Sequence, residues 1–242
     1  VASTASPVGS PVASPTATPT QPVWLRVSHK SYRGLGPMDT RCDLPESLRT
    51  GAPEPALRAL ALCLDRMWTD TLAKVGVTYV KPEVRLIRAQ EEAACASLAF
   101  EWGGIYCYGK NVVNVMIVDG EPAPWFVLAH EYAHHAQFVG AITDGWMTRP
   151  HDDDMGRRSE LQANCLAAVT LRTVLPEELE DMRKAYTAAI GVEVKPEQAE
   201  EVAAILRTHG SWAHNAAWMK RGERKGTVAS CDTWDAPARQ VS

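Results

Sequence analysis

The pattern of apolar and polar positions predicts a first long helix over residues 55–75. Apolar residues recur three or four positions apart, as on one face of a helix. They are Leu57, Leu60, Leu64, Met67, Trp68 and Leu72. Gly76 follows them, and glycine often ends a helix because it adopts the left-handed conformation without strain. The sequence therefore predicts an amphipathic helix that ends near Gly76.

After this helix the pattern changes to that of short strands. Residues 77–80 and 84–87 are each predicted to form a strand, and residues 105–118 a pair of strands that turns at 109–111. From residue 124 onward the pattern is helical, with helices predicted over 124–138, 153–175, 176–190, 196–208 and 211–222. Strands followed by helices favour an α+β domain with a small, mainly antiparallel sheet.

Three consecutive aspartates, Asp152 to Asp154, stand at the start of the second of these later helices. Such a run could bind a cation, or it could cap the helix. Acidic side chains at this position accept hydrogen bonds from free backbone N–H groups and complement the helix dipole. We favour the capping role.

Residues 1–22 repeat Pro among Ser, Thr, Ala and Val, with too little apolar bulk to form a core. We expect a disordered tether there and one folded domain over residues 23–242. Such tracts commonly join an export signal or membrane anchor to a domain beyond it, although a flexible terminus without a role is the alternative. The first residue is Val1, so a targeting segment or anchor would lie upstream of residue 1.

Charge and hydropathy exclude several classes of partner. The net charge is −4 and no block is rich in Lys or Arg, so nothing favours binding to nucleic acid or to an anionic membrane surface. The longest apolar stretches, such as residues 115–118, fall far short of the roughly 18 residues of a membrane span. We therefore expect no nucleic-acid partner and no membrane contact by the folded domain.

The six cysteines lack the CxxC spacing of zinc ribbons and thioredoxins. Together with the tether they favour an oxidising, extracytoplasmic location, either secreted or anchored in the cell envelope, over buried reduced thiols. The predicted pairs are Cys42–Cys63, Cys95–Cys107 and Cys165–Cys231. The first would fasten the incoming segment to the first helix, the second would close a hairpin, and the third would hold the C-terminal tail.

The segment HEYAHHAQ, residues 130–137, carries three of the seven histidines. In a helix, His130 and His134 lie on one face about a turn apart, so both imidazoles can reach one metal ion. Glu131 projects close by and can take a proton from metal-bound water and pass it to a leaving amine. The apolar flanks, PWFVLA and FVGA, indicate a buried helix, where such a cluster would be costly without a partner. The spacing therefore favours a zinc site over a polar helix face.

An open catalytic zinc site needs a third protein ligand. The extended motif HExxHxxGxxH is absent, because Gln137 and Gly140 occupy the positions of its Gly and its last His. In the later segment RRSELQANCLAA, Glu160 and Asn164 share a helix face, so Glu160 can bind the metal while Asn164 hydrogen-bonds a ligand. His151, in a predicted loop, is the weaker candidate for the third ligand.

Two histidines and one glutamate form the ligand set of zinc peptidases. His135 lies roughly 100° around the helix from His134 and therefore cannot bind the same ion. We expect His135 either to support the ligands through hydrogen bonds or to lie at the surface.

Four stretches carry a family resemblance and cover most of the chain beyond the tether. They are CASLAFEWGGIYC (95–107), HEYAHHAQ (130–137), ELQANC (160–165) and HGSWAHNAAWMKRG (209–222). Together they resemble the bacterial putative neutral zinc metallopeptidase family, whose members pair an HExGHHxQ helix with a later ELQADC helix. The resemblance implies a zincin-like fold, Zn²⁺ bound by His130, His134 and Glu160, and Glu131 as general base.

The chain departs from the family pattern at three places. Ala133 replaces a usual Gly, Asn164 a usual Asp, and His214–Asn215 a usual Gln–Arg. Asn at position 164 accepts from a ligand histidine only through a neutral carbonyl, so the basicity of that ligand should be lower than with Asp. His209, between two predicted helices, is a candidate to stabilise a developing oxyanion, with a capping or core role as the alternative.

These observations favour an exported, single-zinc metallopeptidase that hydrolyses a peptide or protein substrate with zinc-activated water. The first alternative is a divergent zinc-binding module of the cell envelope with weak or no catalysis. The second is a protein of a reducing compartment in which the motif is incidental.

Overall fold

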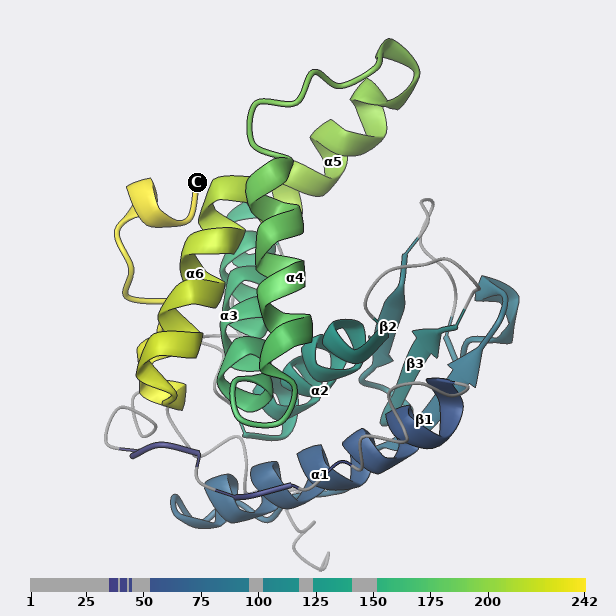
Figure 1. The fold of residues 1–242 in the computed structure, drawn as a ribbon, viewed down its shortest axis with the longest axis vertical. Coiled ribbons are helices and arrows are strands. Elements are labelled where there is room, and N and C mark those ends of the chain that lie inside the picture. The colour runs from purple at the N-terminus through teal and green to yellow at the C-terminus, as the bar shows by residue number, and fades with distance from the viewer. Residues whose placement is uncertain are drawn as a thin grey trace, which may run out of the picture.

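The structure is a computed structural model that describes residues 35–38, 40–42, 44, 53–95, 102–117, 124–140 and 152–242. The predicted tether lies outside these residues. A small sheet stands beside a group of helices, and helix α1 runs beneath both (Figure 1). The described part is therefore of the predicted α+β class and mostly helical.

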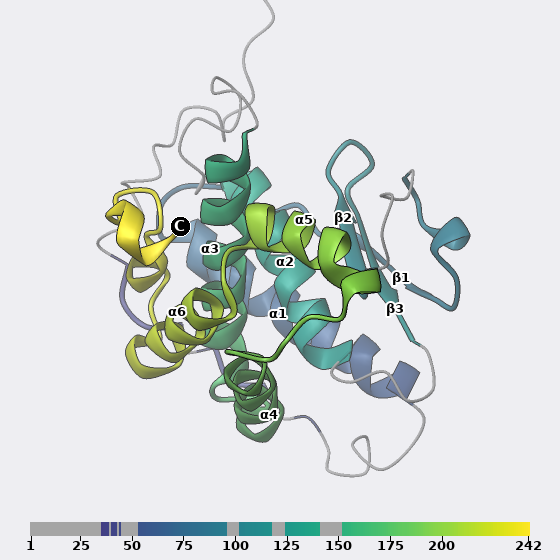
Figure 2. The same cartoon turned by 90° about the horizontal axis from the view of Figure 1, so that it is seen from above.

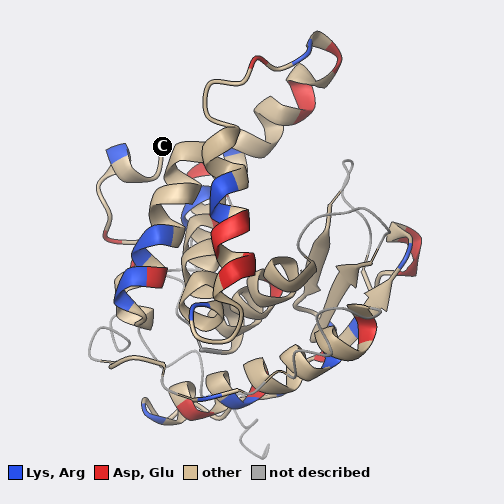
Figure 3. Cartoon of the chain, in the orientation of Figure 1, with Lys and Arg blue, Asp and Glu red and all other residues tan. Residues whose placement is uncertain are grey.

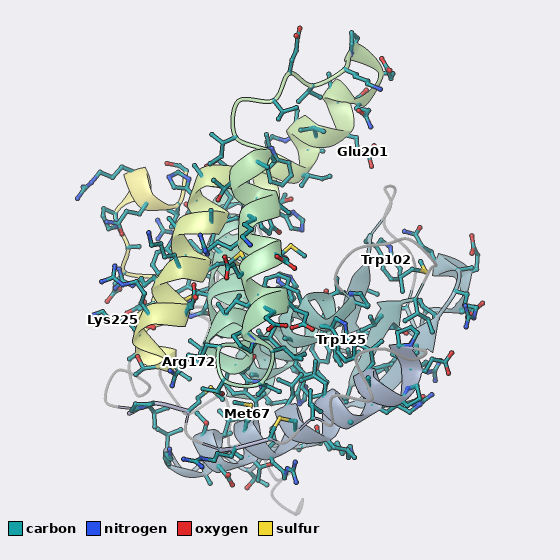
Figure 4. All side chains as sticks on the ribbon, in the orientation of Figure 1. Met67, Trp102, Trp125, Arg172, Glu201 and Lys225 are labelled. Carbon is teal, nitrogen blue, oxygen red and sulfur yellow. A yellow bond between two sulfur atoms is a disulfide. The ribbon has the colours of Figure 1, made fainter. Side chains whose placement is uncertain are left out.

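Helix α1, Pro53–Ala73, buries the apolar face that the sequence predicts. Met67 is fully buried and its side chain lies between α1 and the rest of the core (Figure 4). The helix ends in a left-handed glycine: Gly76 has φ 75°, Val77 N–H bonds Leu72 C=O and Gly76 N–H bonds Ala73 C=O. This is a Schellman motif, which satisfies the last free carbonyls of the helix.

The sheet has the strand order β1-β3-β2. Strand β1, Glu83–Ile87, runs parallel to β3, Val112–Met116, whereas β2, Gly104–Cys107, runs antiparallel to β3. The β2–β3 turn falls where the sequence predicts it, and Asn111 in that turn has φ 54°, which asparagine tolerates well. Strand β2 is therefore an edge strand of the described sheet.

Two predictions about the sheet are wrong. The sheet is mixed rather than mainly antiparallel, because the β2–β3 hairpin places β3 beside β1 in the same direction. Residues 77–80 form no strand. Val77 closes the end of α1, and Tyr79 donates its hydroxyl to Asp65 of α1 at 2.9 Å, so this segment runs along the helix instead of pairing in the sheet.

The helices that follow the sheet agree with the predicted ranges to within a few residues. They are α2 (Pro124–Gly140), α3 (Asp153–Leu171), α4 (Pro176–Ala188), α5 (Ala199–His209) and α6 (Trp212–Lys225). Helix α3 ends earlier than predicted, because Pro176 starts the next helix and holds Leu175 outside the helical region at φ −142° and ψ 64°. Short 3₁₀ turns lie at Gln90–Glu92, Pro196–Gln198, Val228–Cys231 and Ala238–Gln240.

Helix α3 lies at the centre of the helical part, between α2 and α6 (Figure 1). Asp152 caps it, accepting a hydrogen bond from Met155 N–H at 2.9 Å, as the capping interpretation of the aspartate run predicts. Helix α6 approaches α3 closely at Gly222, where a β-carbon would lie only 2.2 Å from the carbonyl oxygen of Cys165. Glycine at position 222 therefore permits the α3–α6 contact.

Three disulfides join the predicted pairs, Cys42–Cys63, Cys95–Cys107 and Cys165–Cys231, with Cα–Cα distances of 5.6, 5.8 and 5.6 Å. Disulfides persist in oxidising compartments, so they indicate an extracytoplasmic environment. Among the described residues no helix has both the length and the apolar character of a membrane span.

Candidate metal centre

The site begins on α2, where His130 and His134 lie one turn apart. Their Nε2 atoms are 3.0 Å from each other. Glu160 of α3 brings its Oε2 atom to 3.1 Å from His130 Nε2 and 3.2 Å from His134 Nε2. The structure thus brings together the three side chains that the sequence analysis proposes as ligands, and they form a cluster able to hold a metal ion.

A side-chain amide holds the far nitrogen of each imidazole. His130 Nδ1 lies 2.8 Å from Asn164 Oδ1, and His134 Nδ1 lies 2.8 Å from Gln137 Oε1. The orientation of Gln137 follows from its other contacts, because its NH₂ group donates to the backbone carbonyl of Ser159 at 2.8 Å. Its carbonyl must then face His134, so His134 carries a proton on Nδ1, and in the neutral ring its Nε2 directs a lone pair toward Glu160.

The resulting arrangement fits a cation. Asn164 likewise turns its carbonyl toward His130, so the two Nε2 lone pairs and the carboxylate oxygen of Glu160 face one another within 3.2 Å. Three acceptors in such proximity repel one another unless a cation or added protons lie between them. Two imidazole nitrogens and one carboxylate oxygen are ligands that suit Zn²⁺. The described residues therefore fit a zinc ion that replaces the contacts among the three ligand atoms and keeps the hydrogen bonds to Asn164 and Gln137.

The acidic and basic groups of this cluster shift each other's pKa values in opposite directions. Burial alone would raise the pKa of Glu160, but the imidazoles of His134 and His209 and hydrogen bonds from the ligand histidines lower it well below its usual value. Burial alone would lower the pKa of His134, but Glu160 outweighs burial and raises it to about 9. A proton thus stabilises the cluster when no metal is bound.

Glu131 lies on the side of α2 that faces strand β2. Its side chain is buried, with 6% of its surface exposed, and it accepts a hydrogen bond from the Tyr106 backbone N–H of this edge strand. Burial raises the pKa of Glu131, against the opposing effects of His130 and His134. A β-carbon at Gly104 would lie 2.9 Å from Glu131 Cγ, so glycine at this position gives Glu131 room against the sheet.

His209 reaches the site from the C-terminal end of α5. Its Nε2 lies 3.7 Å from Glu160 Oε2, its Nδ1 lies 2.9 Å from the hydroxyl of Thr208, and 37% of its side chain is exposed. Figure 2 shows α5 extending over α2 when the molecule is seen from above. His209 is therefore next to the cluster but open to solvent, where it can meet a bound molecule.

The other predicted site histidines lie elsewhere. His135 has no exposed surface, and its Nδ1 is 3.1 Å from the Tyr106 hydroxyl on the side of α2 away from the cluster. The predicted surface location is therefore wrong for His135, and no described contact joins it to the ligands. Burial lowers the pKa of His135 to about 4, so it packs as a neutral core residue. His151 lies outside the described residues.

Two residues join the site without having been predicted. Gln137 follows His134 by three positions, a helical spacing that could have identified it as a hydrogen-bond partner. Tyr186 of α4 hydrogen-bonds the Asn164 side chain close to Glu160, and burial raises its pKa to about 12. No local spacing links Tyr186 to the motifs, because α4 reaches the site only through packing.

Helix α2 itself carries almost no fixed charge. Its 17 residues contain one acidic residue, Glu131, and no lysine or arginine. Figure 3 accordingly shows α2 almost entirely tan, while charged residues gather on outer helices such as α4 and α6. On α2, Glu131 is therefore the only acidic or strongly basic side chain beside the two histidines.

Comparison with known proteins finds relatives of this chain in bacteria. The chain is similar to the uncharacterized protein YpfJ of Escherichia coli strain K12, with 27% identity over 190 residues that cover 69% of this chain and 66% of that protein, just under two thirds of its length. It is also similar to the uncharacterized protein Rv2575 of Mycobacterium tuberculosis strain H37Rv, with 27% identity over 240 residues that cover 83% of this chain and 80% of that protein. No solved structure matches the chain.

A protein-family model described as "Putative neutral zinc metallopeptidase" matches residues 57–234. This range contains the HEYAHHAQ helix, the ELQANC helix and the turn that carries His209. The chain belongs to the putative neutral zinc metallopeptidase family.

Proposed function

We propose that this protein is a single-zinc peptidase that cleaves peptide bonds in an extracytoplasmic compartment. The observation that carries the proposal is the convergence of His130, His134 and Glu160, each His with its far nitrogen held by an amide carbonyl, beside a buried carboxylate at Glu131. The ligand set and the adjacent carboxylate together have the composition of a hydrolytic zinc site.

Zn²⁺, when bound, would polarise the scissile carbonyl and lower the pKa of water in the site. His130, His134 and Glu160 would hold it. Glu131 acts as general base: it takes a proton from the attacking water and delivers it to the leaving amine. Burial raises the pKa of Glu131, which makes its carboxylate a stronger base toward the attacking water.

The proposal also includes a role for His209. Its Nε2 faces the cluster at 3.7 Å from Glu160, and its partial exposure leaves room for a substrate. We propose that His209 donates a hydrogen bond to the oxygen that gains negative charge during hydrolysis. The hydrogen bond between His209 Nδ1 and Thr208 fixes the ring for this task.

The proposal extends to location and partner. The three disulfides support export, and we propose a protein or peptide of the same extracytoplasmic compartment as the substrate. Secretion and attachment through a segment upstream of residue 1 are both compatible with this proposal.

The test combines metal analysis with cleavage of a diverse peptide library. We expect about one Zn²⁺ per chain and cleavage that a chelator abolishes. Glu131→Gln should keep the zinc and lose roughly 10²- to 10⁴-fold in rate, the usual contribution of a general base. Glu200→Gln, on the exposed surface of α5, is the matched control and should cleave normally.

Two outcomes would contradict the proposal. If zinc-loaded protein cleaves no peptide in the library, the zinc-binding module without catalysis takes the place of the enzyme. If Glu160→Ala keeps full zinc occupancy while His151→Ala loses it, the third ligand is wrong.

A further inference from the structure

Three backbone carbonyls at the turn between α5 and α6 converge on one side chain, Asn215. This side chain is 1% exposed, and its NH₂ group donates to the carbonyls of His209, Gly210 and Ser211 at 3.0, 3.3 and 3.0 Å. A carbonyl can only accept a hydrogen bond, so the NH₂ group must face this turn. The Oδ1 atom of Asn215 is thereby directed the other way, toward α3.

The direction of this amide determines that of the next one. Asn215 Oδ1 accepts a hydrogen bond from the NH₂ group of Asn164 on α3. Because Asn164 uses its NH₂ group here, its own Oδ1 faces α2, where it lies 2.8 Å from His130 Nδ1. His130 must then carry its proton on Nδ1, and its Nε2 presents a lone pair to the metal position.

We propose that Asn215 is a positioning residue of the metal centre, which sets the tautomer and ring orientation of His130 through Asn164. This inference rests on the proposed zinc site. Asn215 also holds the turn from which His209 approaches Glu160, so one side chain links the ligand His130 to the candidate oxyanion donor.

An alternative is that Asn215 only fills the core between α3 and α6. The two roles predict different effects when Asn215 is replaced. A filler would affect the stability of the fold, whereas a positioning residue also affects the affinity for zinc, because hydrogen-bond partners of metal ligands typically contribute 10- to 100-fold to that affinity. Zinc affinity therefore separates them, independently of any peptidase activity.

Asn114 provides the matched control. It is an equally buried asparagine whose Oδ1 accepts from Ala94 N–H at 3.0 Å and whose NH₂ group donates to Ile105 C=O at 3.1 Å. These contacts lie within the sheet and its neighbouring segment and do not reach the ligand set. Asn114→Ala should lower the melting temperature and leave zinc affinity within about twofold of wild type.

The experiment measures zinc affinity by competition with a chelator and thermal unfolding of the metal-free proteins, on the full chain. Asn215→Ala should weaken zinc binding by about 10- to 100-fold. Asn164→Ala should weaken it by a similar factor, and the double variant should weaken it no further than Asn164→Ala does, because Asn215 acts through Asn164. If Asn215→Ala does not fold, Asn215→Leu removes the amide at similar volume, leaves Asn164 in place and should show the same loss of zinc affinity.

Three results would overturn the inference: wild-type zinc affinity in the Asn215 variant that folds, an additive loss in the double variant, or an equal loss in Asn114→Ala. Failure of the proposed function looks different. A wild-type protein that binds zinc but cleaves no peptide refutes the peptidase proposal, whereas a loss of zinc affinity in Asn215→Ala would still establish the positioning role.

Discussion

The contact between Glu131 and strand β2 gives the sharpest prediction, through Gly104→Ala. A β-carbon at Gly104 would lie 2.5 Å from Val127 Cγ1, 2.9 Å from Glu131 Cγ and 3.0 Å from the Asn114 carbonyl oxygen. Carbon atoms in contact stand about 3.5 to 4.0 Å apart, so α2 would have to move by about 1 Å on this side. Val127 cannot turn away, because a valine in a helix has essentially one available rotamer.

The magnitude follows from this overlap. Forcing a methyl group into a packed region costs about 1 to 3 kcal/mol, which corresponds to a fall in melting temperature of about 2 to 12 °C for a domain of this size. A displacement of about 1 Å at a catalytic group can lower the rate by about 100-fold. We therefore expect Gly104→Ala to lose about 100-fold in kcat/KM while zinc affinity changes only a few-fold, because the ligands lie on another face of α2 and on α3.

Cleavage, thermal unfolding and zinc competition are measured side by side. Gly109→Ala in the same hairpin is the control, because a β-carbon there meets no atom within 4 Å, and it should match wild type in all three. The double variant Gly104→Ala/Val127→Ala lacks the closest contact, so its melting temperature should be higher than that of Gly104→Ala. Its kcat/KM should stay low, because the contact with Glu131 remains. Wild-type activity in Gly104→Ala would refute the claim that β2 positions Glu131.

The other predictions concern the ligands and the disulfide on α3. The melting temperature of the metal-free protein should fall as pH rises from 6.5 to 9. The pKa of His134 in the folded state is raised from 6.5 to about 9, so the stabilisation that protonated His134 contributes is complete below pH 6.5 and is lost as pH rises through 9. Glu160 has a lowered pKa, so its ionised carboxylate stabilises the folded state above pH 4.5 and this stabilisation is lost as pH falls. Saturating zinc should remove the loss of melting temperature at alkaline pH. A melting temperature of the metal-free protein that does not change with pH would contradict the role assigned to His134. Gln137→Leu should weaken zinc binding by about 10- to 100-fold in chelator competition, and unchanged affinity would mean that His134 needs no such partner. Replacing Cys165 and Cys231 by Ser opens a loop with a sequence separation of 66, which should cost about 4 kcal/mol in denaturant unfolding; a cost below about 1 kcal/mol would show that the C-terminal segment is held by packing alone.

Helices were predictable from the sequence because each carries its own signal. The apolar spacing of α1, the glycine after it and the aspartate cap of α3 all act within a few residues of one another. The strand predicted over residues 77–80 failed for the opposite reason. Its alternation of side chains is compatible with a strand, but Tyr79 bonds Asp65, which lies 14 residues earlier, and no local pattern reports that contact.

The candidate ligands were predictable because helix geometry places them. His130 and His134 are spaced by one turn, as are Glu160 and Asn164, so each helix presents two groups to the site. What the sequence could not give is which amide supports which imidazole. Gln137 serves His134 from the same helix, whereas Asn164 serves His130 from another, and this assignment depends on how α2 packs on α3.

The departures from the family pattern at positions 164 and 215 form a single contact in the structure. By the family resemblance of the sequence motifs, Asn164 stands in place of a usual Asp and Asn215 in place of a usual Arg. In the structure the two amides are hydrogen-bonded to each other. An acid and a base at these positions would form a buried ion pair, and replacing only one of them would leave a buried charge unpaired, at a cost of about 3 to 5 kcal/mol. Replacing both leaves no unpaired charge and keeps a carbonyl oxygen on His130. The lower basicity expected for this ligand therefore comes with an intact hydrogen-bond chain from Asn215 through Asn164 to His130.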